Sequence, residues 1–325
     1  MGFVSNFVLR ASDFSLGINL VSWIKVITNG SMNKIPIGII GVGMVGGAYA
    51  DWFETQGHPI RRYDLFKRIG SLEEVNGVEL VLIAVPTPFD EATDRFDGRA
   101  VESAVSSLVG MKTVIIKSTV LPGTTEMLQQ RYPQHRILFS PEFLTESSAA
   151  DDVSHPKINL IGYTEASRSV APDVLSLFAR APFEKIMPSG EAELFKYLRN
   201  AFFATKVIFF NQMYDLCTKL GIDYEAIREC VAHDPWIGGQ HTIIRHKGYR
   251  GYGGKCLPKD TRAFLRFSAE HGVNQQLLDV VDEINQKITA IPGSSTEREG
   301  ERMGVKEKFE SRVLNQESRQ RRGSP

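Results

Sequence analysis

One local arrangement restricts the fold of this chain more than any other: an apolar run, a glycine-rich turn and a helical stretch follow one another directly. "IPIGII" has the continuous apolar character of a buried parallel strand, and "GVGMVG" comes immediately after it. "GAYADWFETQG" then has helical character, and "HPIRRYD" is typical of a second strand. The order strand, glycine turn, helix, strand predicts a βαβ unit and therefore an α/β fold.

The glycine turn has the spacing G-x-G-x-x-G, formed by Gly41, Gly43 and Gly46 with Val45 inside it. Gly41 would permit the tight turn, Gly43 would let a pyrophosphate approach the backbone, and Gly46 would let helix and strand pack closely. N–H groups at the helix start favour phosphates. The motif predicts a dinucleotide site, and the alternative is a glycine turn without a ligand.

Asp64 strengthens the dinucleotide interpretation, because it follows Gly41 by 23 residues at the end of the second predicted strand. Its carboxylate would accept hydrogen bonds from the adenosine ribose hydroxyls and would repel a 2′-phosphate. The cofactor is therefore predicted to be NAD rather than NADP. Lys67 and Arg68 stand close by in the sequence and weaken this preference.

Further strands are predicted at "VELVLIAVP", "KTVIIKST", "RILFSP" and "KINLIGY", with helical stretches such as "AVESAVSSLVG" between several of them. This alternation predicts a doubly wound, Rossmann-type parallel sheet over residues 35–188. Thr87 and Thr119 lie in loops that leave the carboxyl ends of two strands. Ligands bind at that edge of an open sheet, so both are candidates for cofactor contacts.

Residues 189–290 are predicted to form an all-helical domain, which begins with one long proline-free stretch from Gly190 to Gly221. Residues 1–34 are predicted to be an extension outside the fold, with a packed N-terminal helix as the alternative. Residues 291–325 are charged and nearly free of aromatics, which predicts a disordered tail.

Composition excludes several classes of partner and site. Lys plus Arg and Asp plus Glu both number 38, so no basic excess indicates a nucleic-acid binder. The apolar run near the start is interrupted by Lys25 and is too short to span a membrane. Cys217, Cys230 and Cys256 show no CxxC spacing, which argues against a disulfide framework and a metal site and favours the cytoplasm. Cys217 and Cys230 are predicted to be small buried hydrophobes.

Cys256 stands apart because "RGYGGKCLPKD" surrounds it with glycines that let backbone approach a ligand. Pro258 favours the first turn of a helix, so the thiol is expected at a helix N-terminus. That position, with Lys255 and Lys259 adjacent, predicts a stabilised thiolate. Asp260 lies four residues on, and a thiol beside a carboxylate suggests covalent chemistry followed by attack of water.

Two further pairs have helical i,i+4 spacing. Lys196 and Asn200 would present an ammonium and an amide that could stabilise an oxyanion, or they could lie on an ordinary solvated face. Glu142 and Glu146 in "SPEFLTESSAADD" could raise one another's pKa, or they could be ordinary acidic residues at a helix start.

With these residues in place, the chain resembles the UDP-glucose/GDP-mannose dehydrogenase family. The matching motifs run in the family's order over about residues 35–290: "GVGMVG", "VPTP", "KSTVLPGTT", "SPEFLTE", "KYLRNAFFATK" and "GYGGKCLPKD". The last motif is specific, and the ordered set is more so. The resemblance implies a cytoplasmic enzyme that oxidises the C6 alcohol of a nucleotide sugar to a carboxylate, most favourably UDP-glucose to UDP-glucuronate, while reducing two NAD.

The resemblance also implies roles for individual residues. Cys256 would form a thiohemiacetal and then a thioester, Lys196 and Asn200 would steady the oxyanions, and Asp260 would assist proton transfer. Glu146 and Thr119 would hold or activate water. The residues implied in NAD binding are Gly41, Gly43, Val45, Gly46, Asp64, Thr87, Thr119 and Glu146. Those implied in binding the nucleotide sugar are Glu142, Phe143, Leu144, Lys196, Asn200, Tyr252, Gly253 and Gly254.

The family resemblance implies a homodimer formed through the helical domain, and it also exposes two departures. The family usually continues into a third, UDP-binding domain, whereas the ordered pattern here stops near Ala290. Trp236 stands where many relatives carry an arginine that reaches the partner's substrate.

Two alternative functions stay open at this point. One is a two-electron dehydrogenase of the 3-hydroxyacid type, which shares the dinucleotide fold, the helical domain and a Lys-x-x-x-Asn helix but needs no thiol. The other is an inactive remnant that binds NAD or only dimerises.

Overall fold

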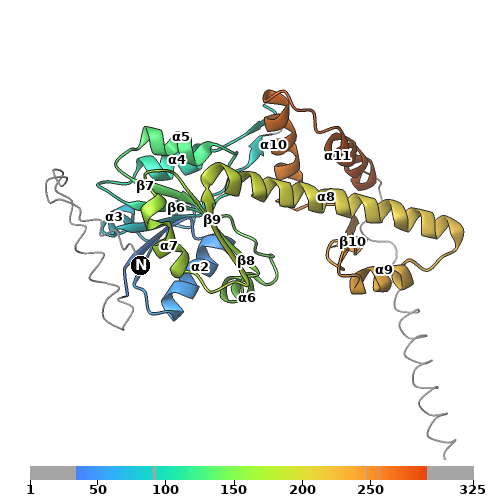
Figure 1. Cartoon of the computed structure of the whole chain (residues 1–325), viewed down its shortest axis with the longest axis horizontal. Coiled ribbons are helices and arrows are strands. Elements are labelled where there is room, and N and C mark those ends of the chain that lie inside the picture. The colour runs from blue at the N-terminus through green and yellow to red at the C-terminus, as the bar shows by residue number, and fades with distance from the viewer. Residues whose placement is uncertain (1–33, 91–92, 247, 255, 291–325) are drawn as a thin grey trace, which may run out of the picture.

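The computed structural model describes residues 34–90, 93–246, 248–254 and 256–290. The predicted extension before residue 34 and the predicted tail 291–325 lie outside the described residues. Figure 1 shows two parts joined by one long helix: a sheet with helices on both faces, and a smaller helical part. The fold class predicted from the alternation of strands and helices is confirmed.

Seven strands form one twisted sheet in the order β2-β1-β3-β6-β7-β8-β9. The first five in this order pair in parallel, as do β8 and β9. The strands are β1 (Ile37–Ile40), β2 (Ile60–Tyr63), β3 (Leu80–Ile83), β6 (Thr113–Ile116), β7 (Arg136–Phe139), β8 (Ile158–Tyr163) and β9 (Phe183–Pro188).

Both faces of this sheet are buried under helices, which explains why its strands are continuously apolar. Ile39 and Leu82 point into one core, against α2, while Val81 and Ile116 point into the other. Successive residues of a strand alternate between faces, so each central strand supplies both cores. The helices around the sheet are α2 (Met44–Thr55), α3 (Leu72–Asn76), α4 (Arg99–Ser106), α5 (Thr124–Arg131), α6 (Ala149–Ser154) and α7 (Ala171–Ser176).

The direction in which strands are added reverses between β1 and β3. The chain leaves β1 toward β2 on one side and then returns to place β3 on the other side. At such a reversal, the loops at the carboxyl ends of the two strands diverge and leave a crevice for a ligand. The glycine turn after β1 and the loop with Thr87 after β3 flank this crevice.

The sheet is mostly parallel, as predicted, and departs from the prediction at one pair, because β8 runs antiparallel to β7. The connection through α6 stays at the carboxyl edge, where β7 ends and β8 begins, so no crossover reverses the chain. Buried strands of either direction have the same apolar pattern. The sequence analysis also missed β9 and two short antiparallel pairs, β4 (Phe89–Asp90) with β5 (Arg95–Phe96), and β10 (Arg245–His246) with β11 (Tyr249–Arg250).

The helical part is built on α8 (Ser189–Leu220), which starts directly after the last strand and has 32 residues. Figure 1 shows α8 leaving the sheet and running through the helical part, with α9 (Tyr224–His233) near its far end. α10 (Leu257–Glu270) and α11 (Gln276–Thr289) pack against α8 and against each other. Within the described ranges, none of the helices combines the length and apolarity needed to cross a bilayer.

Candidate active site

The glycine turn after β1 has the geometry that a dinucleotide requires. Gly41 has φ +89°, and a Cβ there would press against the carbonyl of Ala84. A Cβ on Gly46 would overlap the carbonyl oxygen of Gly41, so helix α2 can approach β1 only with glycine at this position. A Cβ on Gly43, by contrast, would meet no described atom within 4 Å beyond its chain neighbours. The turn is therefore closed toward the protein and open on the side where the pyrophosphate of NAD would lie, with Val45 packed beneath it.

Asp64 organises this turn as well as offering a ribose contact. Its Oδ2 accepts from the backbone N–H of Val42 at 2.8 Å, and its Oδ1 accepts from those of Phe66 and Lys67 at 3.0 and 2.8 Å. Burial opposes ionisation, but these donors lower the pKa of Asp64 below its usual value. A carboxylate has about four acceptor positions, so one stays for a ribose hydroxyl. Lys67 donates to the carbonyl of Val42 at 2.6 Å, which ties the same two segments together a second time.

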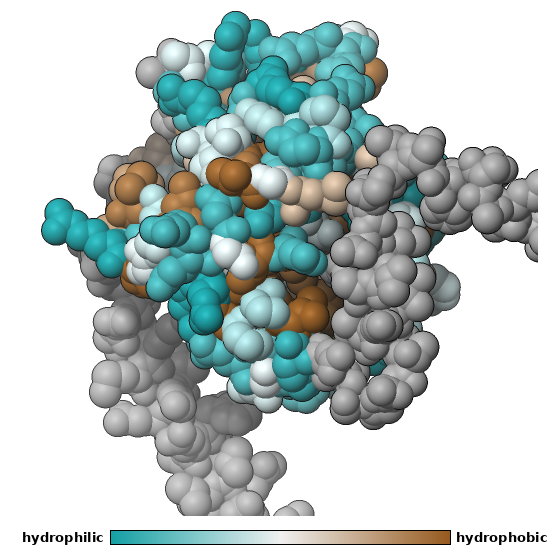
Figure 2. Space-filling model, turned by 90° about the vertical axis from the view of Figure 1, so that its left-hand side faces the viewer, coloured by the Kyte–Doolittle hydropathy of each residue, from teal (hydrophilic) through white to brown (hydrophobic). Residues whose placement is uncertain are grey.

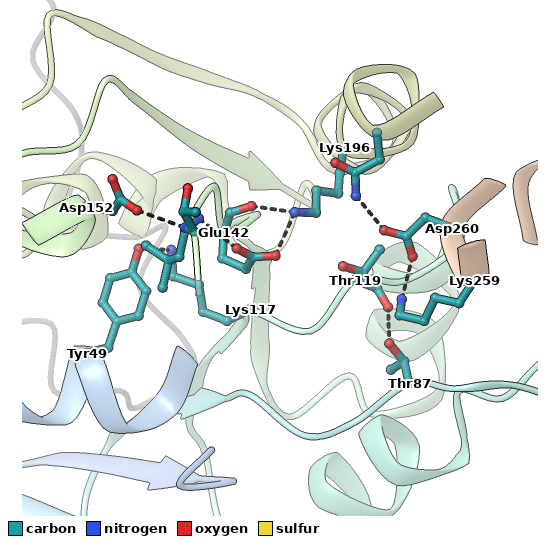
Figure 3. A network of polar contacts seen from close by, with 12 residues as sticks. Tyr49, Thr87, Lys117, Thr119, Glu142, Asp152, Lys196, Lys259 and Asp260 are labelled. Atoms are coloured by element: carbon teal, nitrogen blue, oxygen red, sulfur yellow. Dashed lines mark hydrogen bonds and ion pairs between the residues drawn. The ribbon is translucent and has the colours of Figure 1, made fainter. Parts of the chain in front are cut away.

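The loops after β3 and β6 are joined to each other at the crevice. Thr87 donates from Oγ1 to the carbonyl of Thr119 at 2.8 Å, and Ser118 donates from Oγ to the carbonyl of Val85 at 2.8 Å. Thr87 is buried and Thr119 half-buried. The two predicted threonines thus meet, and Figure 3 draws Thr119 in one cluster with Lys196 and Asp260.

Lys196 is buried, with only 4% of its surface exposed, so the alternative of a solvated helix face is wrong. Its Nζ donates to Oε1 and to the backbone carbonyl of Glu142 at 2.6 and 2.7 Å (Figure 3). Burial opposes ionisation of Glu142, but the Lys196 ammonium holds the pKa of Glu142 below its usual value. The expected rise in a carboxylate pKa is therefore absent from Glu142, because its close partner is a cation.

The loop that carries Glu142 also carries the other predicted contacts of the "SPEFLTE" motif. Leu144 donates its backbone N–H to Oε2 of Glu142 at 2.8 Å, and the ring of Phe143 meets that of Phe195 edge-on at a centroid distance of 6.0 Å. Glu146 lies exposed on the turn that precedes α6. Glu142 thus belongs to the buried cluster, whereas Glu146 is exposed.

Asn200, one turn after Lys196, makes the second pair of the cluster. Its Nδ2 donates to Oδ2 of Asp260 at 2.6 Å, and Lys259 donates to Oδ1 of the same carboxylate. Only 5% of Asn200 and 2% of Asp260 are exposed. α8 therefore presents an ammonium to the sheet domain and an amide to α10 from one buried face.

Cys256 lies at the N-terminus of α10, in the N-cap position, as the sequence predicted, and is exposed. The prediction of a stabilised thiolate is wrong. Partial burial and the carboxylates of Asp260 and Glu142 raise the pKa of Cys256, and the cations Lys196 and Lys259 offset this only in part. The thiol is therefore protonated at neutral pH until a partner takes its proton.

The other two cysteines differ from each other. Cys217 is buried, as expected, among Phe210, Tyr224 and Ile244. Cys230 is exposed on α9, so its prediction as a buried hydrophobe is wrong. Tyr224 is the buried residue of α9, and Val231 packs partly against the same cluster, whereas Cys230 lies on the side of the helix that faces solvent.

The glycine-rich segment before Cys256 is anchored to α11. Tyr252 is buried, with its N–H bonded to Asn285 Oδ1 at 2.7 Å and its hydroxyl donating to Asp282 Oδ1 at 2.8 Å. Gly253 has room for no side chain beside the ring of Tyr249. Gly254 has φ +76° and faces open space. The side chain of Tyr252 holds the loop, while Gly254 leaves free the space next to the thiol.

Sequence reasoning missed Lys117, which directly follows β6. Its buried ammonium donates to the hydroxyls of Tyr49 and Ser140 at 3.0 and 2.9 Å, and burial lowers the pKa of Lys117 to about 7, while Glu142 acts in the opposite direction (Figure 3). A lysine at the carboxyl end of a buried strand was the available signal. Across the described part of the chain, no cluster of three or more His, Cys, Asp or Glu side chains is placed to hold a metal ion.

Comparison with known proteins gives the same picture. Residues 64–180 match the family model "UDP-glucose/GDP-mannose dehydrogenase family, NAD binding domain", and residues 190–287 match that family's central domain. A UDP-glucose 6-dehydrogenase of Pseudomonas aeruginosa is 35% identical over 234 residues, which are 66% of this chain and 50% of that protein. This chain spans about half the length of the curated relatives it matches.

Solved structures agree in fold. A UDP-glucose dehydrogenase from Pyrobaculum islandicum matches with a TM-score of 0.71 and 30% identity, over 80% of this chain and 70% of that one. A 3-hydroxyisobutyrate dehydrogenase from Mycobacterium tuberculosis matches with a TM-score of 0.62 and 16% identity, over 79% of this chain and 94% of that one. The second likeness concerns the fold alone.

Alanine substitutions at Gly43 and Gly46 should have different effects, the first on NAD affinity and the second on folding stability. Gly43→Ala adds a methyl group in open space, so folding should be unaffected, but NAD affinity should fall at least about tenfold, equivalent to ~1.4 kcal/mol. Gly46→Ala overlaps the Gly41 carbonyl and should lower stability by about 1–3 kcal/mol. Calorimetric titration with NAD and thermal melts measure both. Equal NAD affinity in wild type and Gly43→Ala would contradict the placement of the pyrophosphate.

The raised pKa of Cys256 can be tested by brief alkylation of the full chain with iodoacetamide from neutral pH to about pH 11, followed by peptide mass spectrometry. Cys256 should be labelled with a midpoint above the ordinary thiol value of 9.0. Asp260→Asn should move that midpoint to lower pH, because it removes a facing negative charge. Asp279→Asn, a change at an exposed carboxylate on α11, is the matched control. A midpoint below that of a free thiol would refute the electrostatic argument.

Proposed function

We propose, from the premise that this chain belongs to the UDP-glucose/GDP-mannose dehydrogenase family, that it takes part in the NAD-dependent oxidation of the C6 alcohol of a UDP-sugar to the carboxylate. UDP-glucose, oxidised to UDP-glucuronate, is the substrate that we favour. The observation that carries this proposal is that Cys256, at the start of α10, lies close enough to the buried pairs Lys196–Glu142 and Asn200–Asp260 for the charges of Lys196, Glu142 and Asp260 to act on its thiol. A thiol is needed only when an aldehyde is oxidised further to an acid.

NAD, when bound, accepts one hydride from carbon in each of the two oxidations. The side chains of this chain bind the sugar alcohol and accept the proton that its hydroxyl group loses. The Lys196 ammonium and the Asn200 amide project from one face of α8, and they would stabilise the oxygen of C6 as negative charge develops on it. Both side chains are already fixed by their acidic partners, which reduces the reorganisation required during the reaction.

The thiol of Cys256 then adds to the aldehyde. A bond forms between Sγ and C6, and the carbonyl oxygen gains a proton as the thiol loses one. Because the pKa of Cys256 is raised by burial and by Asp260, this proton transfer must accompany the attack. Asp260, one turn along α10, is the proposed carboxylate for proton transfer. Oxidation of the thiohemiacetal gives the thioester.

Hydrolysis completes the sequence. Water adds its oxygen to the acyl carbon, the bond between carbon and Sγ breaks, and the thiol regains a proton as the carboxylate leaves. Glu146 and Thr119 are proposed to hold this water. We add Glu142 to them, because its carboxylate is kept ionised by Lys196 and lies in the same cluster.

The 3-hydroxyacid alternative shares the fold, so the architecture does not distinguish the two reactions. The segment from Gly251 to Asp260 does, because a simple alcohol oxidation uses neither Cys256 nor the glycines that open space around it. A protein that only binds NAD would likewise need no accessible thiol beside the two buried pairs. Substitution of Cys256 therefore distinguishes the three functions.

Purified protein supplied with NAD and UDP-glucose should release two NADH per sugar consumed. Cys256→Ser should form no carboxylate product, whereas Cys230→Ser, at the exposed α9 position, should behave as wild type. NADH absorbance and chromatography of the product measure the outcome. UDP-N-acetylmannosamine and GDP-mannose complete the substrate panel. One NADH per substrate supports a two-electron dehydrogenase, and NAD binding without turnover of any nucleotide sugar rejects the proposal.

The helical part also supports a homodimer, which we propose as the assembly. α8 carries a stripe of exposed apolar side chains that extends along most of its length: Leu194, Leu198, Phe202, Phe209, Leu216 and Leu220. Their spacing of four and seven residues places them on one face of the helix. At the sheet end of the molecule, Figure 2 shows hydrophobic residues in separate patches among hydrophilic ones. A second copy of α8 would cover the continuous stripe.

A charge in this stripe should separate the protomers. Wild type is expected at twice the 36.3 kDa of one chain by light scattering after gel filtration, and Phe202→Glu at the mass of one chain. Phe183→Glu changes an exposed aromatic at the start of β9, outside the apolar stripe of α8, and should leave the dimer intact. A wild-type monomer, or a Phe202→Glu dimer, would exclude α8 as the interface.

A further inference from the structure

Glu193 is buried at the junction of the sheet and the helical part, and nothing in the proposed chemistry uses it. It lies on α8, three residues before Lys196, and 0% of its surface is exposed. Its carboxylate accepts three hydrogen bonds: from the backbone N–H of Gly123 at 2.6 Å, and from the N–H and Oγ1 of Thr125 at 2.9 and 2.6 Å. The donors belong to the loop and first turn that begin α5.

The segment that Glu193 holds is the one that carries Thr119. Along this segment, Ser118 is tied to Val85 and the carbonyl of Thr119 to Thr87, both toward the dinucleotide crevice. A few residues later, Gly123 and Thr125 are tied to Glu193 on α8. The segment is therefore fixed at one end to the cofactor side and at the other end to the helix of Lys196 and Asn200.

We propose that Glu193 is a positioning residue, whose carboxylate holds the Thr119 segment in register with Lys196 and Asn200 on α8. This inference rests on the proposed function and adds a residue to it. Correct placement is valuable here, because displacement of a catalytic group by about 1 Å can cost roughly a hundredfold in rate.

An ionised carboxylate is the form that matches this position, since it only accepts hydrogen bonds and all three neighbours are donors. Protonation would turn one acceptor into a donor and release at least one of them. Burial raises the pKa of Glu193 from 4.5 to about 7, against the three hydrogen bonds that lower it. The titratable groups whose charges act on it are Glu126 on α5 and Tyr197 on α8.

Because the pKa of Glu193 is raised in the folded state, the free energy of unfolding depends on pH. As the pH rises from 4.5 to about 7, Glu193 ionises in the unfolded chain but stays largely protonated in the folded chain. The free energy of unfolding therefore falls as the pH rises through this range. Above pH 7 the fold carries the full cost of a buried charge. Glu193→Gln removes that cost and nearly preserves shape, so its Tm at pH 8 should equal or exceed that of wild type, although one acceptor is lost.

Glu193→Gln should lower kcat at pH 8 at least about tenfold, with the affinity for NAD unchanged within about twofold, because the glycine turn is untouched. Wild-type kcat should fall as pH drops through about 7, and this limb should be absent from Glu193→Gln. Glu126→Gln, at an exposed carboxylate on α5, the helix whose start Glu193 holds, is the matched control and should keep the plateau of kcat. If Glu193→Gln keeps both wild-type kcat and the acid limb, or loses kcat only in proportion to a lowered Tm, the proposal is wrong.

A readout without turnover separates this proposal from the proposed function. Hydrogen exchange of the full chain, corrected for intrinsic rates, should show the amides of Gly123 and Thr125 losing protection below pH 7 in wild type but not in Glu193→Gln. An inactive wild type that shows this pattern would reject only the enzymatic proposal. An active wild type whose amides show no such pH dependence would reject the role of Glu193.

Discussion

The ion pair between Lys196 on α8 and Glu142 after β7 joins the two halves of the chain in a place that water scarcely reaches. A buried charge without a partner is costly, so each member is acceptable only when the other is in position. One turn along, Asn200 and Asp260 impose the same condition between α8 and α10. The first contact helps to hold the long helix against the sheet, and the second holds α10 against that helix, so together they bring charged and polar side chains close to Cys256.

The charged side chains around Cys256 together determine which groups there are ionised. Glu142 and Asp260 carry negative charge, while Lys196, Lys259 and Lys117 supply cations at different depths. The balance favours ionised Glu142 but protonated Cys256, so the thiol is stored in its unreactive form. Burial opposes ionisation of Glu142, Glu193 and Lys117 alike. Burying these side chains lowers the free energy of unfolding, and this cost is expected where side chains must be held in fixed positions at a functional site.

Those features that depend on local backbone were predictable from sequence. The turn from Gly41 to Gly46, the helix start at Pro258 and the 32-residue α8 each follow from a few consecutive residues. What escaped prediction depends on distant neighbours. The antiparallel β8 and the exposed Cys230 have no local signature. The raised pKa of Cys256 comes first from partial burial and then from its helix neighbour Asp260 and from Glu142, and tertiary packing creates this burial and brings Glu142 close. Lys117 and Glu193 look like ordinary charges until their burial is seen.

The most direct test is to locate the acyl group during turnover. Protein incubated with NAD and UDP-glucose can be quenched in acid within one turnover, digested, and its cysteine peptides weighed by mass spectrometry. The buried pairs around Cys256 predict a UDP-glucuronyl mass on the peptide that contains Cys256, and on neither of the peptides that contain Cys217 and Cys230. Steady production of the carboxylate with no adduct on Cys256 at any quench time would contradict a thioester route built on α8 and α10.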